Sequence, residues 1–80
     1  MDDNEIRGTI DKLVAEEREL RAQHELAPLD DERSGRLRNV EESLDQCWDL
    51  LRQRRAKREF GLDPNDVEVR DTSVVEHYRQ

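Results

Sequence analysis

The sequence is poor in the residues from which a small protein usually builds a core or a cross-link. It holds one cysteine and three aromatic residues among 80, and hydrophobic residues make up 32%. One cysteine cannot form an intrachain disulfide, and no group of Cys and His has the spacing of metal ligands. A chain of this length buries a small share of its surface, so the isolated fold is marginally stable. Self-association, or docking onto another protein, is the expected remedy.

Long apolar runs are absent as well. No stretch approaches the ~20 apolar residues that a membrane span needs, and the acidic start "MDDNEIRGT" lacks the apolar segment of a signal peptide. We therefore expect a soluble, cytoplasmic protein with no membrane partner, in which Cys47 stays reduced. The net charge of −7 disfavours non-specific binding to nucleic acid or to acidic membranes by the molecule as a whole.

The apolar residues that are present follow a helical period in the first third of the chain. With Glu17 and His24 filling two places, they recur at spacings of three and four, as in a heptad pattern: Ile6, Ile10, Leu13, Leu20 and Ala27. Asp2 and Asp3 can cap the first turn, and Pro28 ends the helical pattern. The sequence predicts a first helix over residues 3–27.

A second stripe follows the short link "APLDD": Leu37, Val40, Leu44, Cys47 and Leu51. Asp30 is suited to cap a helix, and Gly61 is suited to end it. The sequence predicts a second helix over residues 31–60. Because the link is short, we expect the two helices to fold back on each other. The fold class is all-α, with a coiled-coil-like antiparallel hairpin over residues 1–62.

Residues 63–80 form a tail of different character. Pro64 forbids a continuous helix, and Val67 and Val69 alternate with charged residues, which weakly suggests an extended segment. The run from Ser73 to Glu76 has the pattern of a capping box that could begin a final helical turn. The sequence leaves three alternatives for the tail: disordered, packed on the hairpin, or packed on a second subunit.

The apolar face looks broadest between Leu44 and Leu51, more than one hairpin can cover. This predicts a homodimer, most simply a four-helix bundle. Trp48 is expected to be a packing anchor within the hairpin or across the dimer, with an exposed hot spot as the alternative. The predicted interaction surface consists of Ile6, Ile10, Leu13, Val14, Leu44, Cys47, Trp48 and Leu51.

A basic run ends the second predicted helix: Arg52, Arg54, Arg55, Lys57 and Arg58. Cations at this end face the negative pole of the helix dipole and would lie near the acidic residues 2–5. We therefore interpret the run mainly as a collar of charge. The alternative function is a nucleic-acid-associated accessory protein that grips phosphates with this run, although no aromatic residues are interleaved for base stacking.

Catalysis has no positive support in the sequence. Cys47 lies in mid-helix between Asp45 and Asp49, which disfavours a reactive thiolate. It is best interpreted as a small buried hydrophobe, with a redox sensor or an intersubunit disulfide as the alternative. Glu17 and His24 lack the Glu-x-x-His spacing of metal sites in helical bundles. We therefore expect no enzyme, cofactor, metal or small-molecule substrate.

Three stretches carry a resemblance to a known family: "LRAQHEL", "LDQCWDLLRQRRAKREFGLDP" and "SVVEHYRQ". The sequence is similar to the short actinobacterial proteins grouped as domain of unknown function 2630. The resemblance covers nearly the whole chain, and its central motif is long and specific. It implies a small intracellular helical protein of bacteria. It carries no established activity, cofactor or catalytic residue.

Overall fold

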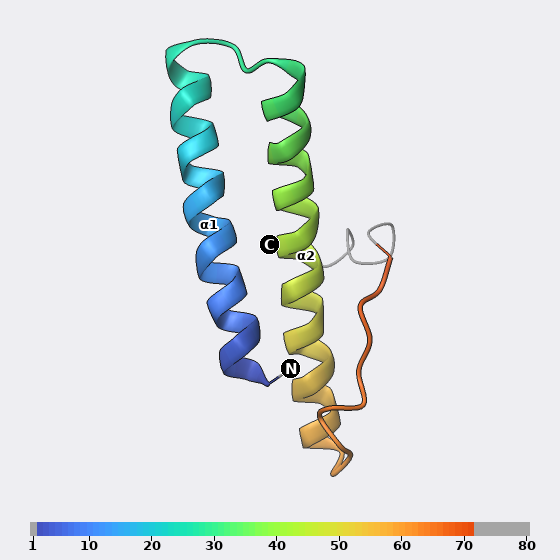
Figure 1. The fold of residues 1–80 in the computed structure, drawn as a ribbon. Coiled ribbons are helices and arrows are strands. Elements are labelled where there is room, and N and C mark those ends of the chain that lie inside the picture. Colours follow the sequence, from blue (N-terminus) through green and yellow to red (C-terminus); the bar gives the residue numbers. More distant parts are fainter. Residues whose placement is uncertain (1, 72–80) are drawn as a thin grey trace.

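The computed structural model describes residues 2–71, which contain two long helices and no strand. Helix α1 spans Asp3–Leu26 and helix α2 spans Asp31–Glu59. A short link joins them, and they lie antiparallel (Figure 1). The predicted all-α hairpin is confirmed, and each helix ends one residue earlier than expected. No helix in this part of the chain is long and apolar enough to cross a membrane.

Local hydrogen bonds set the helix ends. The Asp2 side chain accepts from the Glu5 N–H at 2.8 Å, and Glu5 accepts from the Asp2 N–H in return, which forms a capping box. Asp30 caps α2 by accepting from the Arg33 N–H at 2.8 Å. Gly61 ends α2 with a φ of 70°, a conformation that side chains with a Cβ rarely adopt. The aspartates and the glycine singled out in the sequence thus mark the observed ends.

The core is a single layer of apolar side chains between the two helices. It is small, and it includes the cysteine but not the tryptophan: Ile6, Ile10, Leu20, Val40, Leu44, Cys47 and Leu50 are buried. Glu17 is only partly covered and His24 is exposed, so the two polar interruptions of the first stripe stay outside the core. Burial of this size supports the marginal stability that the composition suggests.

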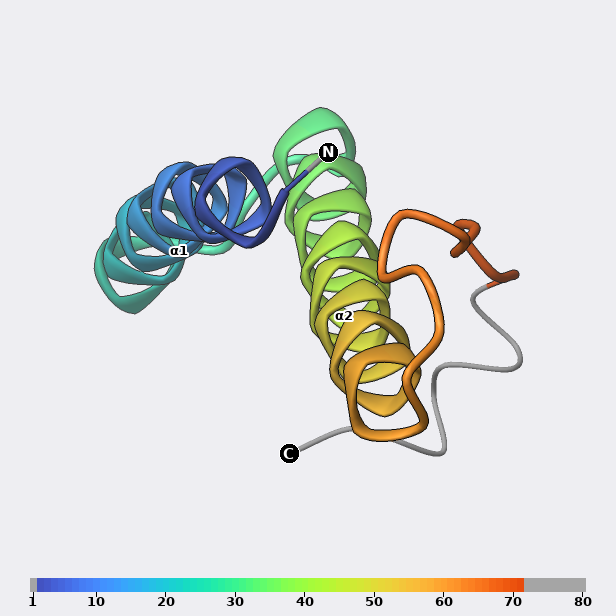
Figure 2. The same cartoon turned by 90° about the horizontal axis from the view of Figure 1, so that it is seen from below.

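Residues 62–71, here called the C-terminal strap, turn back along the side of α2 that faces away from α1 (Figures 1 and 2). Gln53 donates to the Glu68 carbonyl at 2.8 Å and accepts from the Glu68 N–H at 3.4 Å. Val67 packs against the core. Of the three alternatives for the tail, these residues follow the one that packs on the hairpin. The predicted turn at Ser73–Glu76 lies outside the described residues.

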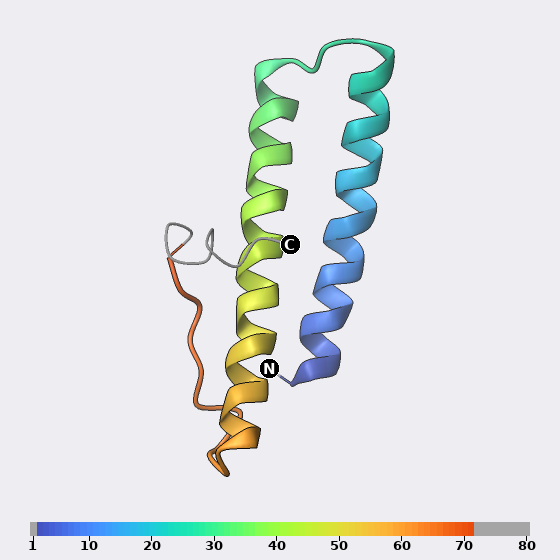
Figure 3. The ribbon, with the colours of Figure 1, turned by 180° about the vertical axis from the view of Figure 1, so that it is seen from behind.

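The last turns of α2 project past the start of α1 (Figure 3). There the buried Arg54 donates to Asp3 of α1, to the Pro64 carbonyl at 3.0 Å and to Asn65 Oδ1 at 3.0 Å. Arg58 donates to the second oxygen of Asp3 at 3.0 Å. The basic end of α2 therefore holds the acidic start of α1, as the charge pattern predicts.

These bonds make stability depend on pH in a defined direction. Hydrogen bonds from Arg54, and secondly from Arg58, hold the pKa of Asp3 below its ordinary range. Because the folded pKa is lowered, the ion pairs stabilise the fold above the pKa of the unfolded carboxyl, about 3.9, and this contribution is lost as pH falls through the folded pKa. Asp3→Asn should lower the urea midpoint at pH 7, and its difference from the wild type should shrink at pH 3.

Asp31 offers a matched control, because it is also the first helical residue after an aspartate cap but is exposed. Asp31→Asn loses the same interaction with a helix dipole without losing an arginine partner. An equal midpoint loss in Asp3→Asn and Asp31→Asn at pH 7 would contradict a specific role for the Asp3 ion pairs.

Candidate interaction surface

Helix α2 presents three sides to three different surroundings, since successive residues turn by about 100°. One side packs on α1 and one is covered by the C-terminal strap. The third side is turned to solvent and carries Trp48, whose exposed fraction is 38%. Neighbours at helical spacings of three and four place five residues on this third side: Glu41, Asp45, Trp48, Arg52 and Arg55.

The structure divides the predicted interaction surface into two parts. Ile6, Ile10, Leu44 and Cys47 are buried in the hairpin core. Leu13, Val14 and Leu51 are partly buried against that core, and Trp48 is exposed at its edge. The expectation that one hairpin cannot cover the patch between Leu44 and Leu51 is thus corrected, because α1 and the strap cover most of it. Trp48 alone remains exposed in this patch, which agrees with the alternative of an exposed tryptophan.

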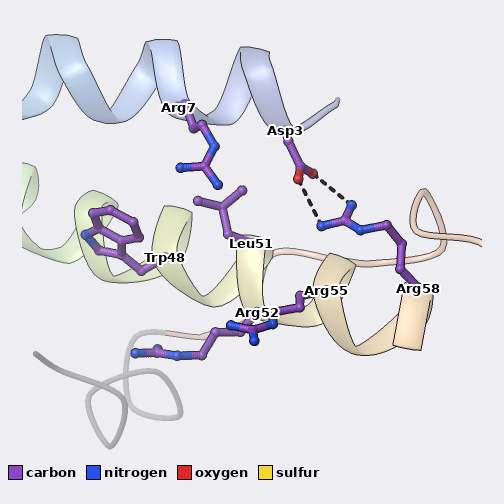
Figure 4. A pocket seen from close by; sticks show the side chains of 7 residues that line it. All are labelled: Asp3, Arg7, Trp48, Leu51, Arg52, Arg55 and Arg58. Atoms are coloured by element: carbon purple, nitrogen blue, oxygen red, sulfur yellow. Dashed lines mark hydrogen bonds and ion pairs between the residues drawn. The ribbon is translucent and has the colours of Figure 1, made fainter. Parts of the chain in front are cut away.

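A hollow of about 330 Å³ opens on one side of Trp48, near the start of α1 and the last turns of α2 (Figure 4). Its lining combines an apolar floor with a ring of charge: Asp3, Arg7, Trp48, Leu51, Arg52, Arg55 and Arg58. Figure 4 shows Arg7 reaching down from α1 towards Leu51, and the Asp3–Arg58 pair at one end. With four arginines and one carboxylate, this hollow is cationic; we call it the cationic hollow.

A second hollow of about 410 Å³ lies on the other side of Trp48, towards the hairpin turn. Its charge has the opposite sign: it is lined by Val14, Glu17, Arg21, Glu41, Leu44, Asp45 and Trp48. Three carboxylates face one arginine here, and Arg21 contacts Glu17 at 3.4 Å and Glu41 at 3.8 Å. We call it the acidic hollow. The exposed face of Trp48 therefore separates two hollows of opposite charge, and the whole surface is called the Trp48 face below.

The predicted basic run does not form one patch. Arg54 is buried and held by Asp3, which also binds Arg58. Arg55 pairs with Glu59 at 3.1 Å, and Lys57 contacts Asp66 at 3.7 Å. Arg52 and Arg55 line the cationic hollow. Most of these cations therefore form ion pairs with carboxylates of the same chain. This agrees with the interpretation of the run as a collar of charge.

Asp49 is the residue whose role the sequence did not reveal. It is fully buried, with an exposed fraction of 0%. Its two oxygens accept from Arg70 at 2.6 and 2.8 Å, and Gln53 donates to it at 2.8 Å. Gln46 adds a bond to the Arg70 carbonyl at 3.2 Å. The sequence did contain one signal for a second packed side of α2: the polar residues 46, 49 and 53 recur at helical spacing. The residue that packs on this side, Arg70, lies about twenty residues further along the chain.

Cys47 lies within the core, and burial raises the pKa of its thiol. A raised pKa leaves less of the nucleophilic thiolate at neutral pH. It belongs to the same core cluster as the buried Leu44 and Leu50 of α2. This placement agrees with the interpretation of Cys47 as a packing residue.

Fold and surface together define a class of small two-helix hairpin proteins. In this chain the C-terminal strap covers one side of α2, and another side exposes a tryptophan. The chain belongs to the family "Protein of unknown function (DUF2630)", whose model matches residues 2–80. It is 49% identical over 77 residues to two uncharacterized proteins, Mb0922c of Mycobacterium bovis and Rv0898c of Mycobacterium tuberculosis. These alignments cover 95% of this chain and 88% of each relative. No solved structure matches the chain.

The buried Asp49–Arg70 pair should hold the strap on α2. Arg70→Gln removes two charge-assisted hydrogen bonds and leaves a buried carboxylate less compensated, at a cost of about 2 kcal/mol. Amide hydrogen exchange should then quicken in residues 62–71 while the middle of both helices stays protected. Asp66→Asn is the control, since it removes only the exposed contact with Lys57. Unchanged exchange in the strap of Arg70→Gln would contradict this role of Asp49.

Burial of Cys47 predicts slow reaction with an alkylating probe in the native protein. Labelling at neutral pH should be at least about tenfold slower than in urea, because the core must open before the thiol is reached. Mass spectrometry of timed samples measures both rates. Native labelling as fast as unfolded labelling would instead favour the redox alternative.

Proposed function

We propose that this protein is a small, non-enzymatic cytoplasmic interaction protein that self-associates through the Trp48 face. The observation that carries the proposal is the 38% exposure of Trp48 between two hollows. A tryptophan is the most costly apolar side chain to leave in water, and in this chain it is the only one. Such a residue at the centre of a concave surface is typical of a binding hot spot.

The surroundings of Trp48 support the same proposal. Val14 and Leu51 line the hollows on either side and are themselves only partly buried, so an apolar centre is surrounded by charged residues. An apolar centre with a polar rim is the usual anatomy of a protein interface. A second copy that covers this face would also add the buried area that the small core lacks.

The nucleic-acid alternative has less support than it had from the sequence. Its strongest feature was a run of five cations, and the structure turns that run in several directions. Arg54 faces Asp3 and the strap, while Lys57 faces Asp66. Phosphate grips need exposed cations that follow one backbone, and here carboxylates of the same chain accompany them.

Analytical ultracentrifugation of the purified chain at micromolar concentration tests the proposal. The wild type should sediment as a dimer, and Trp48→Ala should weaken dimerisation at least about 30-fold, as expected for a hot spot of ~2 kcal/mol or more. Phe60→Ala is the matched control, because it removes another aromatic residue, 78% exposed at the end of α2, that lines neither hollow. That variant should remain dimeric.

Circular dichroism should show the same helical content in both variants. A wild type that is monomeric at micromolar concentration and still well folded would overturn self-association. A dimer that survives Trp48→Ala but not Phe60→Ala would place the interface elsewhere.

A further inference from the structure

We propose that the two copies meet in an antiparallel, two-fold arrangement in which the Trp48 side chains face each other at the axis. The cationic hollow of each copy then covers the acidic hollow of the other. This inference rests on the proposed function and adds to it the orientation of the partner and the residue pairs that select it.

The spacing of charges along α2 carries the inference. Glu41 and Arg55 lie on the exposed side of the helix, seven residues before and seven residues after Trp48. Seven residues make nearly two turns, about 10.5 Å along the axis. A two-fold axis through Trp48 therefore brings Arg55 opposite the partner subunit's Glu41, and Glu41 opposite the partner subunit's Arg55. A two-fold interface needs such a self-complementary patch.

The inner positions repeat the pattern. Asp45 precedes Trp48 by three residues and Arg52 follows it by four, so each would lie near its opposite in the other copy. On α1, Arg7 lines the cationic hollow and Glu17 lines the acidic hollow. Helix α1 therefore has its positive and negative charges at the same ends of the Trp48 face as α2. The two residues of contrary sign are Asp3, which binds Arg54 and Arg58, and Arg21, which contacts Glu17 and Glu41.

The opposite orientation is disfavoured by charge. If the two copies lay parallel, Arg52 and Arg55 on α2 would each lie opposite the same residue of the other copy, and so would Glu41 and Asp45. Opposed like charges at an interface cost several kcal/mol, whereas the antiparallel orientation turns each of these repulsions into an attraction.

At the outer positions, 41 and 55, the contacts within one chain that a second copy would cover are partly or largely exposed. Arg55 is paired with Glu59 one turn away, with exposed side-chain fractions of 78% and 60%. Glu41 is 3.8 Å from Arg21, with exposed fractions of 33% and 57%. Exposed ion pairs of this kind add little to stability because water screens them, so replacing them with pairs across the dimer costs little.

Charge reversal at positions 41 and 55 tests the orientation. Glu41→Arg and Arg55→Glu should each weaken homodimerisation at least about tenfold, because each places two like-charged pairs in the interface. An equimolar mixture of the two variants should form a heterodimer, since both cross-pairs are again arginine with glutamate. The double variant in one chain should recover its own dimer but pair poorly with the wild type.

Lys12→Glu and Glu19→Arg are the controls, because both residues are exposed on α1 and line neither hollow. Both should dimerise like the wild type. Raising the salt concentration should weaken the wild-type dimer, a test that needs no substitution.

Native mass spectrometry and ultracentrifugation distinguish the outcomes. Selective heterodimers in the mixture, with salt-sensitive wild-type dimers, support the orientation. Wild-type dimers that tolerate both single reversals, or that ignore salt, overturn the orientation while leaving self-association through Trp48 intact. A monomeric wild type removes the proposed function and this inference together.

Discussion

The arrangement of the chain depends on the hydrogen bonds that the guanidinium group of Arg54 makes to α1 and to the strap. This group is buried at the end of α2, where it binds Asp3 at the start of α1 and two groups at the start of the strap, the Pro64 carbonyl and Asn65. A buried charge is tolerated only when its partners are in place. This one residue therefore joins three segments that the small apolar core alone would hold weakly, and its partner Asp3 lines the cationic hollow.

The helices and their pairing were predictable because their signals are local or periodic. Apolar residues at spacings of three and four define both helices, and short polar side chains and one glycine mark their ends. A short link makes the antiparallel hairpin the simple solution. Opposite charge at the two free ends then predicts the contact between Asp3 and the last turns of α2, which the structure confirms.

The second packed side of α2 was not predictable in the same way. Leu50 is not part of the apolar stripe that predicts α2, and Asp49 enters the sequence analysis only as an acidic neighbour of Cys47. Both are buried: Arg70 of the strap binds Asp49, and Leu50 belongs to the core against which Val67 packs. The polar residues at positions 46, 49 and 53 indicate a second packed side, but no periodic pattern tells which segment covers it, because the strap is extended. The position of Trp48 stayed open between packing and exposure for a related reason: α1 and the strap cover the other two sides of α2 (Figure 2), and the path of the strap is not evident from the sequence.

Trp48 is the only tryptophan of the chain, so its fluorescence reports directly on the surface that we assign to self-association. The most direct measurement is acrylamide quenching of this fluorescence across a dilution series of the wild type. We predict that Trp48 is shielded at high concentration and becomes more accessible on dilution, with unchanged helical content. Quenching that is strong and independent of concentration, in a folded protein, would contradict an interface centred on Trp48.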